Sequence, residues 1–86
     1  MSTKKEKPVR TLRDGLLKAV IWRNEGEKGP FYSVQLLRAY QDDQETWHDV
    51  NSFSGGDILR IAHLTGHAYD AIAKLRGEDR AQEAGA

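Results

Sequence analysis

Two runs of alternating side chains decide the fold: LKAVIWR at residues 17–23 and FYSVQLLRAY at residues 31–40. Both are rich in β-branched and aromatic residues, which favour strands, and successive side chains of a strand point to opposite faces. The odd-numbered positions from Leu17 to Ile21 share one apolar face, opposite Lys18, Val20 and Trp22. In the second run the even-numbered positions 32–40 form the better core face. We therefore predict two neighbouring strands, over residues 16–24 and 31–40.

Shorter signals predict a strand on each side of this pair. Residues 10–14 form a first strand that ends at the turn pair Asp14-Gly15. Residues 24–30 contain two glycines and a proline, which is typical of a loop. Residues 41–45 predict a hairpin turn, and residues 46–53 a fourth strand.

A helix follows the fourth strand. Ser54 is placed as its N-cap, with Asp57 in the capping-box position. We expect the helix from about Gly55 to Arg76, because Gly77 is a typical residue to end it. The fold class is therefore α+β, a four-stranded antiparallel sheet followed by one long helix (ββββα).

Apolar side chains recur along this helix at the 3.6-residue period and predict one stripe. The stripe consists of Ile58, Ile61, Ala62, Thr65, Ala68, Tyr69, Ile72 and Leu75. The side chains expected opposite the stripe are Arg60, His63, His67, Asp70 and Lys74. Gly66 weakens the middle of the helix by roughly 1 kcal/mol relative to Ala, which we interpret as a sign of close contact with another backbone.

Length and composition indicate one small domain. The chain has 86 residues and no cysteine, which excludes disulfides, thiolate metal sites and thiol nucleophiles. Its beginning shows no apolar leader, and no apolar run approaches the roughly 20 residues of a membrane span. We expect a soluble cytoplasmic protein with a disordered basic arm over residues 1–9, one domain over residues 10–76 and a disordered tail over residues 77–86.

The formal net charge of zero conceals an asymmetry. Residues 1–38 hold nine Lys and Arg against four acids, a net charge of +5, and residues 39–86 hold four against nine, a net charge of −5. A basic half can attract phosphate. The two halves can equally attract each other, within one chain or between two chains.

The order of elements and several motifs resemble a known family. The long strand ends in Leu37-Arg38-Ala39-Tyr40, the turn Gln41-Asp42-Asp43-Gln44 follows, and the helix starts shortly after Ser52-Phe53-Ser54. This pattern, over about residues 16–75, resembles the single-stranded-DNA-binding transcriptional coactivator domain called positive cofactor four and its bacterial and plant Whirly-type relatives. The chain is also similar to small bacterial proteins of the mobile-element kind, a likeness that implies no activity.

The resemblance implies a curved four-stranded sheet, a homodimer paired through the helix, and single-stranded DNA as ligand. Tyr40 stands where the family has an aromatic residue that stacks on a base. Where the family has an arginine three residues earlier, this chain has Leu37, with Arg38 one position further on. Trp22, Arg23 and Lys28 occupy a region that is basic and aromatic in the family. The dimer interface it implies is Ile58, Ile61, Ala62, Thr65, Ala68, Tyr69 and Ile72.

Basic and aromatic side chains alternate along the predicted strands, as on surfaces that stack bases and neutralise phosphates. The predicted nucleic-acid-binding residues are Lys18, Trp22, Arg23, Lys28, Arg38, Tyr40 and Trp47. Their aromatic members can alternatively belong to the core, as we expect for Tyr32. Their cations can alternatively form exposed ion pairs, which contribute roughly 0–1 kcal/mol each.

No cluster of residues in the sequence indicates catalysis. Ser52 and Ser54 have no evident base, and the glycines fit no phosphate-binding fingerprint. His63 and His67 are four residues apart, with Asp70 on the same face, but the adjacent Glu of a zinc protease is missing. We expect a solvent-facing histidine pair, no metal, no cofactor and no enzyme activity.

Two hypotheses follow. In the first, the protein is a homodimeric module that binds single-stranded DNA, or RNA, in transcription or DNA metabolism, with neither a membrane nor a small-molecule substrate as partner. In the alternative, the same fold is a protein–protein interaction or dimerisation module without nucleic-acid activity. Salt discriminates between them, since phosphate binding weakens steeply with ionic strength and an apolar interface does not.

Overall fold

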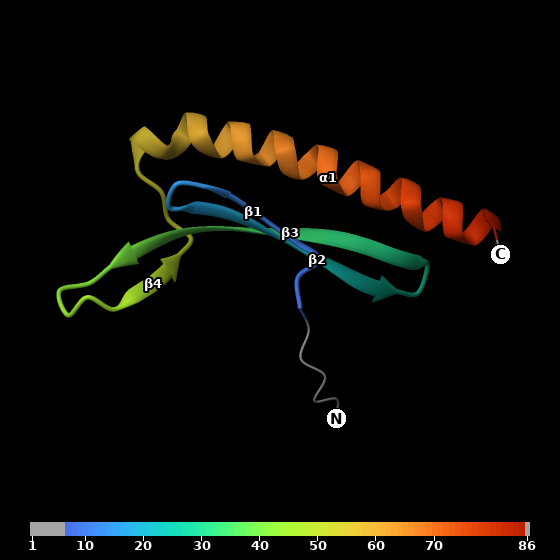
Figure 1. The fold of residues 1–86 in the computed structure, drawn as a ribbon, viewed down its shortest axis with the longest axis horizontal. Helices are drawn as coiled ribbons and strands as arrows, with labels where there is room; N and C mark the ends of the chain where they lie inside the picture. The colour runs from blue at the N-terminus through green and yellow to red at the C-terminus, as the bar shows by residue number, and fades with distance from the viewer. Residues whose placement is uncertain (1–6, 86) are drawn as a thin grey trace, which may run out of the picture.

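The computed structural model describes residues 7–85, in which one helix covers one face of a sheet (Figure 1). The strands are β1 (Arg10–Asp14), β2 (Leu17–Gly26), β3 (Gly29–Gln41) and β4 (Trp47–Val50). A single 3-10 turn, η1 (Gly55–Asp57), leads into the helix α1 (Ile58–Gly85). The strands are antiparallel in the order β1-β2-β3-β4, which confirms the predicted ββββα arrangement.

The core lies between β2 and α1. Its buried members are Leu17, Ala19, Ile21, Leu64, Ala68 and Ala71. Ile21 has no exposed surface, and Leu12, Tyr32 and Leu36 pack against the same cluster while partly exposed. Because half of the buried members are alanines, the helix can lie close to the sheet.

The strand register divides the sheet's side chains between two faces. Ala19 pairs with Leu36 and Arg23 with Tyr32, and these residues share the face that α1 covers. Trp22 pairs with Ser33 on the opposite face. The predicted alternation of β2 is therefore confirmed, as is the placement of Tyr32 against the core.

The helix packs through a face rotated from the predicted stripe. Leu64 and Ala71, which the predicted stripe omits, are buried against the sheet. Ile58 and Tyr69, which it includes, are 57% and 75% exposed. Periodicity misplaced the stripe because alanines and large apolar residues occur on nearly every side of this helix. Four members of the predicted stripe do pack on the core: Ile61, Ala68, Ile72 and Leu75.

The end of the helix differs from the sequence-based expectation. α1 continues through Gly77 to Gly85, which corrects both the predicted helix end and the predicted tail. The fourth strand is shorter than expected and ends at Val50. Of the predicted N-terminal arm, residues 1–6 lie outside the described residues, whereas the Val9 N–H donates to the carbonyl of Ile21 at 2.9 Å and extends the ladder.

A contact with the β2–β3 hairpin explains why the helix continues past Gly77. The Tyr32 hydroxyl donates to Oδ2 of Asp79 at 2.6 Å, and the Arg23 guanidinium approaches Oδ1 at 3.4 Å. The hydrogen bond from Tyr32, aided by the charge of Arg23, lowers the pKa of Asp79. The hydrogen bond between Tyr32 and Asp79 thus joins the last turns of α1 to the sheet. The two residues are 47 positions apart in the sequence.

Gly77→Ala should stabilise the protein. Gly77 is helical here, and a Cβ atom at this position meets no atom of residues 7–85 within 4 Å. Replacing an interior helical glycine with alanine contributes roughly 1 kcal/mol. Chemical denaturation should show a higher free energy of unfolding for the variant. Far-UV circular dichroism should show an equal or higher helix content. The matched control is Gly15→Ala, which should destabilise, because Gly15 has φ +63° and a Cβ there lies 3.1 Å from Arg60. A helix that ended at Gly77 would give a loss at that position instead.

Asp79→Asn should destabilise the protein in a pH-dependent way. Because folding lowers the pKa of Asp79, its ionised form stabilises the fold above the unfolded carboxyl pKa of about 3.9. That contribution disappears as the pH falls through the lower folded pKa. The Tm of the variant should therefore lie below that of the wild type near neutral pH and converge with it in acid.

The control for this measurement is Asp70→Asn, an exposed carboxylate on the same helix that makes no ion pair within residues 7–85. Its Tm should follow the wild type throughout. A difference between Asp79→Asn and wild type that stays constant with pH would contradict the role given to the charge.

Candidate nucleic-acid interface

The sheet face turned away from α1 carries three aromatic side chains. The register places Trp22 opposite Ser33, Phe31 opposite Asn24 and Trp47 opposite Gln41, all on this face. Phe31 is 52% exposed and Trp47 is 57% exposed. Trp22 and Phe31 are diagonal neighbours in the β2–β3 pair. Diagonal pairs of this kind generally stand about 7–8 Å apart, within reach of aromatic side chains. We call this surface the open sheet face; its members include Arg13, Lys18, Trp22, Asn24, Phe31, Ser33, Gln35 and Trp47. The same register also places on it the buried Val20, the half-buried Leu37 and Ala39, and the acid Asp49.

Polar groups beside these rings are held by hydrogen bonds between β2 and β3. The indole N–H of Trp22 donates to Oε1 of Gln35 at 3.4 Å, and Nδ2 of Asn24 donates to Oγ of Ser33 at 3.2 Å. A shallow hollow of about 540 Å³ lies over these residues. Amide and hydroxyl groups in such a hollow can donate to and accept from the edge of a base, with an aromatic ring beside them.

The open sheet face carries two cations in neighbouring positions. Arg13 of β1 pairs in register with Lys18 of β2. The Lys18 ammonium contacts Oδ2 of Asp49 at 2.9 Å. The Lys18 side chain is only 20% exposed and that of Asp49 is 42% exposed, so this pair is partly shielded from water. A phosphate that reaches the lysine has to displace Asp49. Arg13 is exposed and makes no ion pair with any residue in the described part of the chain.

Asp42 organises the hairpin that presents Trp47. One carboxylate oxygen accepts from the backbone N–H groups of Gln44 and Thr46, each at 2.9 Å, and the other contacts Nε2 of His48 at 2.7 Å. These contacts, with the one to His48 the largest cause, lower the pKa of Asp42. The β3–β4 hairpin, which projects to one side of the molecule in Figure 1, is thereby preorganised next to Trp47.

The structure separates the seven sequence-predicted binding residues. Lys18, Trp22 and Trp47 lie on the open sheet face, and Lys28 lies in the exposed β2–β3 turn. Arg23, Arg38 and Tyr40 lie on the other face of the strands, the face on which α1 packs. No single flat surface therefore contacts all seven.

The three residues on the helix side already have partners within the chain. Arg23 contacts Glu25 and Asp79, and Arg38 donates to the carbonyl of Ser52 at 3.2 Å and approaches Asp57 at 3.7 Å. The ring of Tyr40 stacks on His48, with centroids 5.1 Å apart, although Tyr40 remains 38% exposed.

These contacts explain part of the charge asymmetry. Lys18, Arg23 and Arg38 belong to the basic half of the sequence, and their partners Asp49, Asp79 and Asp57 belong to the acidic half. The two halves therefore attract each other within one chain. Among residues 7–38, the cations that form no such pair within the described part of the chain are the better candidates for phosphate contacts.

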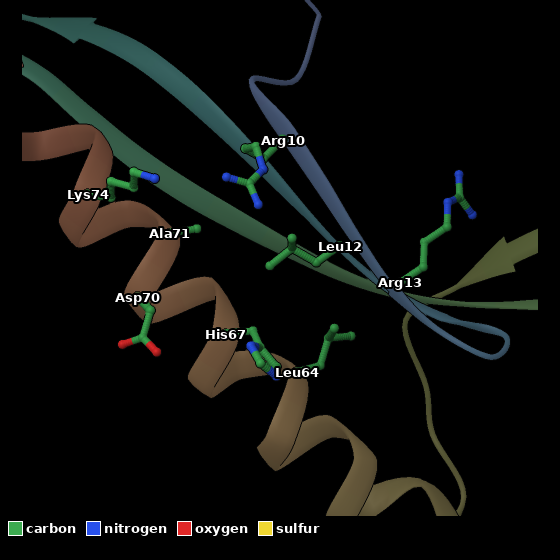
Figure 2. Close-up of a pocket in the computed structure, with 8 residues that line it drawn as sticks. All are labelled: Arg10, Leu12, Arg13, Leu64, His67, Asp70, Ala71 and Lys74. Carbon is green, nitrogen blue, oxygen red and sulfur yellow. The ribbon is translucent and has the colours of Figure 1, made fainter. Parts of the chain in front are cut away.

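Some of those cations line a cleft between β1 and α1 that sequence reasoning did not identify. Figure 2 shows Arg10 and Lys74 pointing toward one another, while the Asp70 carboxylate turns away. The cleft has a volume of about 380 Å³, and Leu12, Leu64 and Ala71 contribute apolar surface to it. Because β1 is the edge strand, Arg10 and Arg13 give this edge a basic side chain on each face.

Sequence reasoning missed Arg13 and Phe31 as members of the open sheet face. Both could have been identified from strand pairing, because Arg13 pairs with Lys18 and Phe31 pairs with Asn24, and paired residues share a face. The sequence alone does not give the register between two strands, so it does not show which of their residues share a face. Residue type and the family resemblance drew attention to Arg23 and Tyr40, which lie on the other face.

Neither a search of protein-family models nor searches of curated proteins and of solved structures returned a match to this chain. No helix in the described range 7–85 combines the length and the apolar character needed to cross a membrane.

Proposed function

We propose that this protein binds single-stranded nucleic acid, DNA in the first instance, across the open sheet face. The observation that supports the proposal best is the accessibility of Phe31 and Trp47 on a face that α1 leaves uncovered. Stacking of a base on such a ring contributes about 1–3 kcal/mol and tolerates any sequence. Trp22, beside Phe31, adds a third ring to the path.

Phosphate contacts complete the proposed interface. Arg13 is the cation best placed, and Lys18 can exchange Asp49 for a phosphate. Lys28 extends the same path at the hairpin turn. Each phosphate contact should add about −0.7 to the slope of log affinity against log salt, so a few contacts give a clear salt dependence. A role in transcription or DNA metabolism would follow from such sequence-tolerant binding.

We also propose that the protein is a homodimer paired through the outer surface of α1. The core contains few large side chains, whereas Ile58, Leu59 and Tyr69 are 57%, 83% and 75% exposed on the helix. Small domains often gain stability by burying such side chains between two copies. The proposed contact differs from the predicted one, because Ile61, Ala68 and Ile72 already pack on the sheet of their own chain.

Trp47→Ala should weaken binding of a single-stranded oligonucleotide by about 5- to 100-fold, the equivalent of one lost stacking interaction. Fluorescence anisotropy of a labelled strand, titrated at low and at physiological salt, measures this. Tyr40→Ala is the matched control: Tyr40 and Trp47 belong to adjacent rungs of one hairpin but to opposite faces. Binding by Tyr40→Ala should stay near that of the wild type.

The outcome separates the two faces. Loss of binding in Tyr40→Ala alone would transfer the interface to the face that the family resemblance indicates. Absence of binding by the wild type at low salt would contradict the nucleic-acid proposal and favour the protein-interaction alternative. A parallel titration with RNA of the same sequence tests which nucleic acid is preferred.

A further inference from the structure

Two histidines one turn apart on α1, His63 and His67, face each other on the flank of the helix. His67 also lines the cleft between α1 and β1 (Figure 2). Nε2 of His63 lies 3.0 Å from Nε2 of His67, and the two rings are nearly perpendicular, with an interplanar angle of 84° and centroids 4.4 Å apart. Both side chains are exposed. Their Nε2 atoms thus come together beside the helix at hydrogen-bonding distance, one donating and the other accepting while both imidazoles are neutral.

The convergence suits a metal ion bound by both nitrogens. Zinc binds imidazole nitrogen at about 2.0–2.1 Å, so two ligands of a tetrahedral site stand roughly 3.3 Å apart. The observed separation of 3.0 Å needs only a small rotation of one ring to reach that value. Histidines four residues apart on one helix are a known way to supply two zinc ligands.

One chain leaves such a site incomplete. Within residues 7–85 no group of three His, Cys, Asp or Glu side chains is arranged to hold a metal. Asp70, the nearest acid in sequence, turns its carboxylate away from His67 (Figure 2). Structural zinc sites are almost always four-coordinate, so two further ligands have to come from elsewhere.

The surface beside the pair can accommodate a second copy of the helix. A shallow hollow of about 510 Å³ is bordered by Ala62, His63, Gly66, His67, Tyr69 and Asp70. A Cβ at Gly66 would meet nothing within 4 Å in the part of the chain that the structure describes, so the helix backbone is open to close approach there. Leu59, one turn before His63, is 83% exposed and supplies apolar area to the same side.

We propose that two copies of this chain bind one Zn²⁺ through His63 and His67 of each, so that zinc stabilises the dimer. A two-fold axis through the metal presents the same histidine pair twice and gives four nitrogen ligands in a tetrahedron. Imidazole ligands favour zinc, nickel and copper over magnesium. The inference rests on the proposed homodimer and adds a shared zinc ion to its interface.

Analytical ultracentrifugation of the full chain tests the proposal, in EDTA, in Zn²⁺ and in Mg²⁺. Zinc should lower the dimer dissociation constant about tenfold or more relative to EDTA, because it binds the dimer preferentially. Magnesium should have no effect. Isothermal titration calorimetry should give one zinc for every two chains.

Substitutions assign the effect to the pair. His63→Gln and His67→Gln should each abolish the zinc-dependent shift. His48→Gln is the matched control, because His48 contacts Asp42 in the β3–β4 hairpin, away from α1. It should keep the full response to zinc. Circular dichroism of each variant verifies that its fold is intact.

The outcomes separate this inference from the homodimer itself. A dimer that forms equally in EDTA and in zinc would overturn the zinc site and leave the homodimer standing. A monomer in both conditions would overturn both proposals. Zinc bound at one ion per chain without a change in mass would show a site completed by water, which also contradicts the shared site.

Discussion

The packing of α1 against β2 is the interaction on which the rest of the structure depends. Leu17 and Ile21 meet Leu64 there, and the remaining buried positions of this layer are alanines. Burial of a large aliphatic side chain contributes about 1.5–3 kcal/mol, whereas an alanine contributes much less. The core is therefore small, and its few large side chains carry most of its stabilising effect.

A single helix can cover only one face of a sheet, and two surfaces stay accessible as a result. One is the open sheet face, where aromatic rings lie among polar side chains. The other is the outer side of α1, where Leu59 and Tyr69 are exposed. The two surfaces differ in chemistry. The sheet carries aromatic rings with basic neighbours, and the helix carries Leu59 and Tyr69 beside a histidine pair, which is the reason for proposing different partners for them.

The ion pairs of the structure join regions that the sequence keeps far apart. Arg23 reaches Asp79 and Lys18 reaches Asp49, so cations of the basic half meet acids of the acidic half. The hydrogen bond from Tyr32 to Asp79 reinforces the first of these contacts and connects the β2–β3 hairpin to the last turns of α1. Part of the positive charge of the basic half is therefore neutralised by acids of the same chain and is less available to a polyanion.

Much of the fold could be predicted from local pattern. The alternation at 17–23, the turn at Asp14-Gly15 and the capping residues Ser54 and Asp57 act over a few residues, and the structure bears each of them out. The predicted core face at 31–40 holds for Tyr32 and Leu36, whereas Val34 and Tyr40 are 39% and 38% exposed. The helix end could not be predicted, because a distant hydrogen bond to Asp79 outweighs the local preference of Gly77 to stop a helix. The side of the helix that meets the sheet also escaped prediction, since its apolar residues nearly encircle it.

The sequence by itself determined the order of the elements and the alternation within each strand, because these follow from backbone sterics and side-chain size over short range. Only the tertiary structure decided which binding candidates share a surface. Strand pairing placed Trp22 and Trp47 with Arg13 on one face and Arg23, Arg38 and Tyr40 on the other. The physical reason is that a face is defined by register between strands, and register joins residues that are distant along the chain.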